Sequence, residues 1–220
     1  MKTKNTAISG GTVKYALFLI AYVILIRILP GILHMPNYQP AMYVILGIAG
    51  MILSWDELKI AGTSWKEHPV RNILIIAGGY IITVIIDNLA IIPYGLLYAD
   101  QAGSMNENNI QAALTAVSPI LFIAGTSIFG PVVEETVFRN ILTTKLGKVI
   151  PKYLAALIAS IAFGMIHMHA FTLSEFLSVM PHIAGGFFWS VILIKTKNIT
   201  LVYGIHILNN LPSILMMLMM

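Results

Sequence analysis

The chain has 220 residues, of which 58% are hydrophobic and only 10% are charged. A soluble domain carries about 25% charged residues, and a soluble fold of this length has too little interior for so much apolar surface. The composition therefore predicts an integral membrane protein. Nucleic acid is not an expected partner, because the 13 Lys and Arg lie mostly in short segments between apolar runs. The absence of cysteine excludes disulfides and thiolate metal sites.

Seven apolar segments follow one another along the chain, and a transmembrane helix needs about 20 such residues. They cover approximately residues 13–29, 41–53, 72–92, 111–144, 151–168, 173–194 and 199–219. The second and fifth are short for a complete crossing. We predict an all-α, polytopic membrane bundle of about seven transmembrane helices, forming a single domain over 1–220. Its motif-bearing core covers about 111–219.

Basic residues alternate between the loops. They occur at the chain start, between the second and third segments, between the fourth and fifth, and between the sixth and seventh. The loops 30–40, 93–110 and 169–174 contain neither Lys nor Arg. The positive-inside rule then places the N-terminus in the cytoplasm and the C-terminus outside. The stretch 55–67, which mixes Trp55 and Trp65 with charges of both signs, is predicted to lie at the cytoplasmic interface.

The sequence from Pro131 to Asn140, PVVEETVFRN, carries three charges within an apolar segment. Charge inside a membrane costs free energy and commonly marks a functional site. Glu135 and Arg139 are four residues apart on a helix, so we predict an ion pair between them. Glu134 lies about 100° away around the same helix and faces a different neighbour.

Three further polar residues lie at the depth of Glu134. Counting about 1.5 Å per helical residue from the cytoplasmic lysines puts Glu134, His167, His206 and Asn210 between about 13 and 22 Å deep in a hydrocarbon core about 30 Å thick. His206 and Asn210 share one side of the last helix because they are four residues apart. We predict a polar cluster between helices. The alternative is that each residue satisfies a separate interhelical hydrogen bond.

This set of residues suits the hydrolysis of an amide. A glutamate in a site of low dielectric constant can act as a general base on water, and a neutral histidine can orient that water. A histidine and an asparagine on one helix face can stabilise an oxyanion. Alternatively, Glu134, His167 and His206 could bind zinc, with water as the fourth ligand. The usual His-Glu-x-x-His zinc motif is absent.

Other polar residues in the apolar segments carry less weight. Arg27 and Asp87 are expected to reach the membrane surface or to pair structurally. His182 lies at the depth of the cluster, where an ordinary packing role outweighs a supporting role at the site.

Three motifs in this order resemble those of the CAAX-protease and bacteriocin-processing (CPBP, or Abi) intramembrane proteases. They are Glu134-Glu135-x-x-x-Arg139, Phe163-x-x-x-His167 and His206-x-x-x-Asn210. The resemblance implies that Glu134 is the catalytic base and His167 its partner on the water. It implies an oxyanion site at His206 and Asn210, with Glu135 and Arg139 as structural support. Both a metalloprotease and a metal-free glutamate mechanism are consistent with it, so the cofactor is either absent or zinc.

The sequence and the resemblance together predict an intramembrane endopeptidase in a bacterial plasma membrane. Its partners would be the lipid bilayer and a membrane-associated peptide or protein substrate, with a role in bacteriocin self-immunity or peptide processing. One alternative is a non-catalytic immunity or scaffold protein. The other is a proton-coupled transporter, against which the lack of an internal repeat argues. No particular oligomeric state is predicted.

Overall fold

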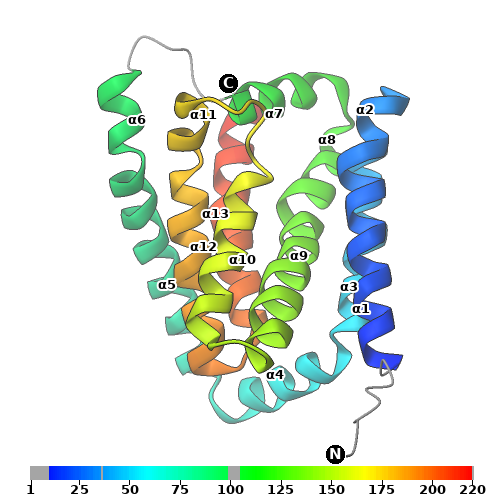
Figure 1. The fold of residues 1–220 in the computed structure, drawn as a ribbon, viewed down its shortest axis with the longest axis vertical. Coiled ribbons are helices and arrows are strands. Elements are labelled where there is room, and N and C mark those ends of the chain that lie inside the picture. Colours follow the sequence, from blue (N-terminus) through cyan, green and yellow to red (C-terminus); the bar gives the residue numbers. More distant parts are fainter. Residues whose placement is uncertain (1–9, 36, 99–104, 220) are drawn as a thin grey trace, which may run out of the picture.

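The structure, a computed structural model, describes residues 10–35, 37–98 and 105–219, and every regular element within these ranges is helical. The predicted all-α class is therefore confirmed. Long helices run alongside one another, with α4 across one end of the bundle and α7 across the other (Figure 1). Within these described ranges, five helices are long and apolar enough to cross a membrane, or six if a bent pair counts as one span. The number seven and the cytoplasmic N-terminus stay predictions.

The first predicted segment forms one helix with a change of winding. Helix α1 (Gly10–Tyr22) continues into the π-helical segment η1 (Val23–Ile28) and then into α2 (Leu29–Leu33). Tyr22 and Ile26 are buried against the rest of the bundle. The helix ends at His34, whose φ of 50° lies in the left-handed region.

The second segment bends into the predicted interfacial stretch. Helices α3 (Tyr38–Leu53) and α4 (Trp55–Glu67) meet at an angle of 76°. Figure 1 shows α4 lying across the end of the bundle. The stretch 55–67, predicted to lie at the membrane interface, is therefore a helix. Trp65 Nε1 donates to the Thr200 hydroxyl at 2.9 Å, and Lys145 pairs with Glu57. These contacts connect α4 to two other spans.

The third segment forms α5 (Pro69–Ala90), which continues as α6 (Ile92–Leu97) after a break at Ile91. Together they make an apolar stretch of 29 residues. Helix α5 packs against the last two long helices, α12 and α13.

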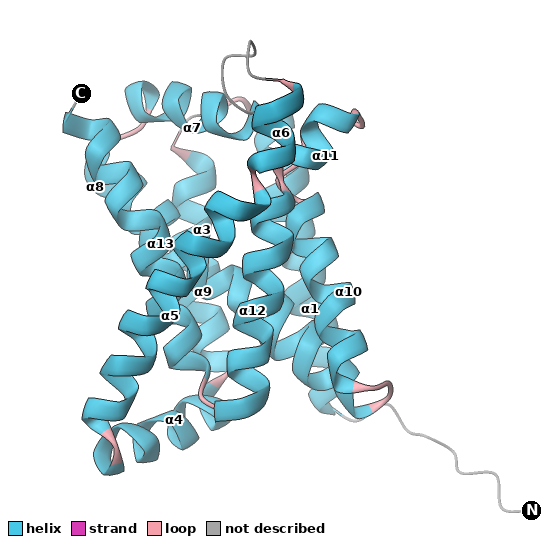
Figure 2. Ribbon diagram, turned by 90° about the vertical axis from the view of Figure 1, so that its left-hand side faces the viewer, coloured by secondary structure: helices cyan, strands magenta, loops and turns pink. Residues whose placement is uncertain are grey.

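The predicted start of the fourth segment near residue 111 is wrong. Residues Met105–Ala116 form a separate helix, α7, and the spanning helix begins only at Pro119. A proline disfavours the helical region for the residue before it, and Ser118 has φ −53° and ψ 126°, outside that region. The chain therefore turns at Ser118, and α7 lies across the bundle end instead of continuing it (Figures 1 and 2).

The spanning helix Pro119–Lys148 is the most enclosed of the five long helices. In its most apolar stretch of 18 residues, 61% of the residues are buried. It contains the short helix α8 (Pro119–Phe122), the π-helical η2 (Ile123–Phe129), α9 (Gly130–Glu135), the π-helical η3 (Thr136–Lys145) and the 3₁₀ turn η4 (Leu146–Lys148). A Cβ at Gly125 would lie 2.6 Å from the carbonyl oxygen of Pro40, so glycine permits the close crossing with α3.

The remaining helices surround this central helix. They are α10 (Lys152–Met165), α11 (Leu173–Ser178), α12 (Met180–Thr196) and α13 (Ile199–Met219). Helix α10 packs against η3 and α12, while α13 packs against η2 and α9. The central helix thus presents its charged residues to neighbours on several sides, and the predicted seventh segment matches α13.

Candidate active site

His206 on α13 lies between the two adjacent glutamates of the central helix. Its Nδ1 is 2.8 Å from Glu135 Oε1, and its Nε2 is 3.6 Å from Glu134 Oε2. The side chain of Glu135 is fully buried, whereas that of Glu134 retains 10% exposure. The imidazole of His206 therefore contacts both carboxylates. Of the two, only the Glu134 carboxylate faces the internal cavity.

Glu135 also forms the predicted ion pair with Arg139. Arg139 Nε lies 2.9 Å from Glu135 Oε2, and both side chains are buried. The guanidinium carbon of Arg139 lies 4.5 Å from the ring centroid of Phe163 and 5.2 Å from that of Trp189. Two aromatic faces thus enclose a cation whose charge is balanced by a neighbouring carboxylate.

His167 is positioned by its own backbone and by a second histidine. Its Nδ1 lies 2.9 Å from the carbonyl oxygen of Phe163, four residues earlier. A carbonyl only accepts hydrogen bonds, so Nδ1 carries the proton and Nε2 of a neutral ring is left as an acceptor. The ring of His182 on α12 stacks on that of His167, with centroids 4.0 Å apart and planes inclined by 26°.

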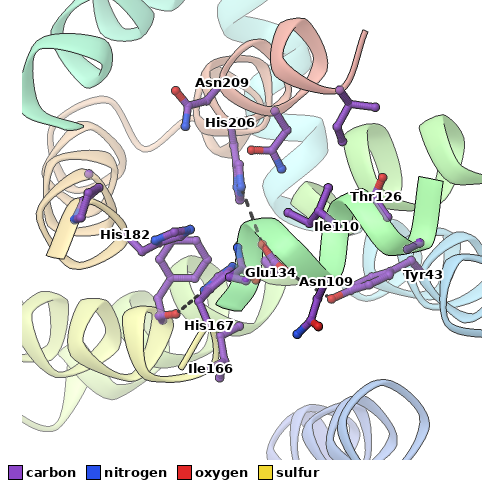
Figure 3. A pocket seen from close by; sticks show the side chains of 18 of the residues that line it. Tyr43, Asn109, Ile110, Thr126, Glu134, Ile166, His167, His182, His206 and Asn209 are labelled. Carbon is purple, nitrogen blue, oxygen red and sulfur yellow. Dashed lines mark hydrogen bonds and ion pairs between the residues drawn. The ribbon is translucent and has the colours of Figure 1, made fainter. Parts of the chain in front are cut away.

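The side chains of Glu134, His167, His182 and His206 line one cavity of about 470 Å³. Figure 3 shows Glu134 between His206 on one side and His167 with His182 on the other. Tyr43 donates a long hydrogen bond of 3.4 Å to Glu134 Oε1. The cavity is also lined by further polar side chains, namely Arg27, Gln39, Asp87, Asn106, Asn109, Thr126, His169, Asn209 and Asn210. Such a concave site with convergent polar groups has the form of a ligand-binding site.

The structure brings the sequence-predicted residues together to different degrees. Contacts connect Glu134, Glu135, Arg139 and His206 into one group, while His167 and Asn210 line the same cavity. The neighbour of Asn210, Asn209, donates to Asp87 at 3.4 Å. Tyr43 was not predicted as a site residue, because a tyrosine in an apolar helix carries no signal in the sequence. The stacking of His182 on His167 supports a larger role for His182 than its position in the sequence indicates.

The three candidate zinc ligands are not gathered around a common point. Among the described residues, no group of three or more His, Asp or Glu side chains is arranged to hold a metal ion. This geometry does not fit a zinc site at Glu134, His167 and His206, so no step below is routed through a metal.

The segment that carries the site matches a known family. Residues 116–212 match the family model described as type II CAAX prenyl endopeptidase Rce1-like. The chain is 30% identical over 111 residues to "Putative membrane peptidase YdiL" of Bacillus subtilis (strain 168), which covers 50% of this chain and 43% of that protein. It is 27% identical over 120 residues to an uncharacterized protein of Mycoplasma capricolum, covering 54% and 34%.

The chain thus spans less than half the length of these two relatives. No solved structure matches it. The matched segment contains all six predicted site residues, and the match confirms the resemblance that the three motifs predicted.

Proposed function

We propose that this chain, Rce1-like over residues 116–212, is an intramembrane endopeptidase that hydrolyses a peptide bond of a membrane-associated peptide or protein. The observation that carries the proposal is the position of Glu134. It is a buried carboxylate that contacts His206 and Tyr43 and opens into a cavity also lined by His167. A carboxylate in that setting is suited to remove a proton from water.

The proposed reaction uses only side chains of this chain. Glu134 takes a proton from a water molecule, whose oxygen attacks the carbonyl carbon of the scissile peptide bond. The free Nε2 of His167 accepts the other hydrogen of that water and so orients it. Collapse of the tetrahedral intermediate breaks the C–N bond, and Glu134 returns its proton to the leaving amine. A carboxylic acid and an amine are the products.

The developing oxyanion needs donors that are already in place. Asn210 lines the cavity on the same helix as His206, one turn away, and its amide can donate. We propose that His206 donates as well, as an imidazolium. Its Nδ1 then donates to Glu135, and its Nε2 faces the cavity side of Glu134. With both glutamates ionised, His206 and Arg139 would make the buried group electrically neutral, which limits the cost of burying it.

We propose a bacterial plasma membrane as the location, because both relatives above come from bacteria and several helices here are long enough to span a bilayer. Processing of small peptides, including bacteriocin self-immunity, is the proposed biological role. The metal-free mechanism is preferred over zinc because of the ligand geometry described above.

Replacement of Glu134 by glutamine tests the proposal, because this change removes the base and nearly conserves the volume. Wild type and Glu134→Gln are purified in detergent, reconstituted in liposomes and incubated with a library of acylated peptides, whose products are identified by mass spectrometry. Glu67→Gln, an exposed residue of α4, serves as the matched control. We expect cleavage by wild type and Glu67→Gln, with a loss of at least about 10²-fold in Glu134→Gln.

Three results would contradict the proposal. Equal cleavage by wild type and Glu134→Gln would show that a contaminating protease is responsible. No cleavage by wild type, together with an immunity phenotype that survives Glu134→Gln and His206→Ala in cells, would favour the non-catalytic scaffold. Proton flux that depends on Glu134, without cleavage, would favour the transporter.

A further inference from the structure

We propose that Arg27 is an anion-binding residue of the cavity, which holds a carboxylate of the substrate and so positions the peptide chain beside Glu134. The carboxylate is either the C-terminus of the substrate or the side chain of an aspartate or glutamate. The inference rests on the proposed peptidase function, and Arg27 lies outside the segment 116–212 that matches the Rce1-like family.

Arg27 is a cation in an apolar helix that lines the cavity. The stretch Val13–Leu33 has a mean hydropathy of 2.5 and is long enough to cross the membrane. A charged residue in such a helix is costly unless it faces protein or a water-filled space, and it is a functional candidate by default. The Arg27 side chain is among those that line the cavity with Glu134, His167 and His206. Arg27 is exposed, and it also makes the structural pairing expected of it through its hydrogen bond to the Ile166 carbonyl.

The winding of the helix at this position is irregular. Arg27 belongs to the π-helical segment Val23–Ile28, and π-helical turns occur often at functional sites. The neighbouring residue, Ile26, is buried at 1% exposure, and its carbonyl oxygen accepts a hydrogen bond from Gln39 at 3.2 Å. Gln39 itself lines the cavity. The hydrogen bond from Gln39 thus restrains the backbone next to Arg27, which limits the directions that the Arg27 side chain can take.

The Arg27 guanidinium has N–H donors available to bind an anion. Its guanidinium donates to the backbone carbonyl of Ile166, the residue before His167. In the described part of the chain, no carboxylate forms an ion pair with Arg27. The guanidinium of Arg139, by contrast, forms a buried ion pair with Glu135. A guanidinium has five N–H donors, and two parallel ones match the oxygens of a carboxylate. One bond to a carbonyl leaves enough donors for such a pair.

The position of Arg27 fits a role in placing the substrate. The Ile166 carbonyl connects it to the residue next to His167, which orients the water in the proposed reaction. Arg27, Glu134 and His167 line the same cavity. A peptide whose carboxylate is held at Arg27 would therefore extend past the catalytic base, and the distance between anchor and base would select the bond that is cut.

A structural role must be distinguished from this one. The hydrogen bond to Ile166 also connects the N-terminal helix to the end of α10, so loss of Arg27 could weaken the fold or displace His167. A structural residue would affect all substrates to the same extent. An anion-binding residue would affect only substrates that carry the carboxylate, and mainly through KM.

The experiment compares four pools of N-myristoylated peptides of otherwise equal sequence. Each has either a free C-terminal carboxylate or a C-terminal amide, combined with either one internal glutamate or glutamine at that position. Wild type, Arg27→Gln and Arg27→Lys are assayed in liposomes, with Arg71→Gln as the control. Arg71 is an exposed arginine of α5 that bonds to Ser64 and does not line the cavity.

We expect wild type and Arg71→Gln to prefer one carboxylate over its neutral partner by about ten- to a hundredfold in kcat/KM, mainly through KM. Arg27→Gln should abolish that preference, and Arg27→Lys should retain part of it. Loss of the preference for a free C-terminus identifies the chain end as the ligand, and loss of the preference for glutamate identifies the side chain. The proposal is overturned if wild type shows neither preference or if Arg27→Gln keeps it.

Binding separates this proposal from failure of the proposed function. The same four pools, labelled with a fluorophore, are titrated against Glu134→Gln and against Glu134→Gln combined with Arg27→Gln, and anisotropy is measured. Tighter binding of the carboxylate pools that depends on Arg27 supports the anion site even if no cleavage is found. Equal binding of all four pools to both proteins overturns it even if the peptidase function is established.

Discussion

The Nδ1 atom of His206 lies 2.8 Å from Oε1 of Glu135, a contact between side chains 71 positions apart in the chain. Glu135 is therefore more than the ion-pair partner of Arg139, because its second oxygen holds the imidazole of His206. Since the carboxylate of Glu135 accepts a hydrogen bond from Nδ1–H of His206, the orientation and proton placement of His206 depend on Glu135. This arrangement gives the second glutamate of the motif a positioning role in the proposed reaction.

Replacement of Glu135 by glutamine should impair both catalysis and stability. We expect a decrease in kcat/KM on the order of 10³- to 10⁴-fold, the effect of removing a histidine-orienting carboxylate in serine proteases. Arg139 would keep its charge without a partner, which should lower the free energy of unfolding by about 3–5 kcal/mol. Cleavage assays and unfolding in detergent measure the two effects.

The double variant Glu135→Gln with Arg139→Met separates these effects. Removal of both charges should restore much of the stability and leave activity low, because His206 still lacks its carboxylate. If activity returns together with stability, Glu135 has only a structural role.

His182 should support catalysis through its stacking on His167. We expect His182→Ala to lower kcat by up to about tenfold, because a stacked ring pair contributes about 0.5–1.5 kcal/mol to the placement of each ring. His182→Phe should retain most of the activity, since it keeps an aromatic face at the same position. Steady-state kinetics measure both, with the exposed His68→Ala as the control. An equally large loss in His182→Phe would show that an imidazole nitrogen is needed instead.

Gly125 should be required for the crossing of the central helix with α3. A Cβ there would lie 2.6 Å from Pro40 O and 2.7 Å from Pro40 Cα, and backbone atoms cannot move aside cheaply. We expect Gly125→Ala to lower the free energy of unfolding by about 1–3 kcal/mol. Gly78→Ala is the matched control, since nothing lies within 4 Å of a Cβ at that helical position.

The control should be neutral or gain up to about 1 kcal/mol from helix propensity. Unfolding of the three proteins in a denaturing detergent series compares them directly. Equal stability of the two alanine variants would mean that the helices can separate at Gly125 without cost.

Cleavage should not depend on a bound metal. We expect activity to survive dialysis against a zinc chelator, and purified active protein to contain far less than one zinc per chain by elemental analysis. The reason is that Glu134, His167 and His206 are not arranged as a common ligand set. Loss of activity on chelation, with recovery on addition of zinc, would contradict the metal-free mechanism and support zinc binding by these residues.

Local relationships along the helices could be predicted from the sequence. The pair Glu135 and Arg139 depends only on a spacing of four residues, which any helix converts into contact. The common depth of Glu134, His167 and His206 depends only on helical rise and on the positions of the flanking lysines. Both predictions therefore needed no knowledge of how the helices pack.

The start of the central helix was predicted wrongly for a physical reason. Hydropathy runs almost continuously from residue 111 into the motif, but Pro119 disfavours a helical conformation at Ser118, which lies outside the helical region. The chain then turns, and α7 lies across the end of the bundle. The proline was visible in the sequence, and the apolar pattern concealed its effect.

The sequence by itself determined the membrane class, the helical architecture and six of the polar groups at the candidate site, because composition and spacing act along one chain. Only the tertiary structure decided which groups meet. The rotation of α13 places His206 between two glutamates, the packing of α12 stacks His182 on His167, and Arg27, within the π-helical segment Val23–Ile28, lines the same cavity. The rotation of each helix and the angles at which helices cross are set by the shapes of many side chains at once. A local sequence pattern therefore does not predict them.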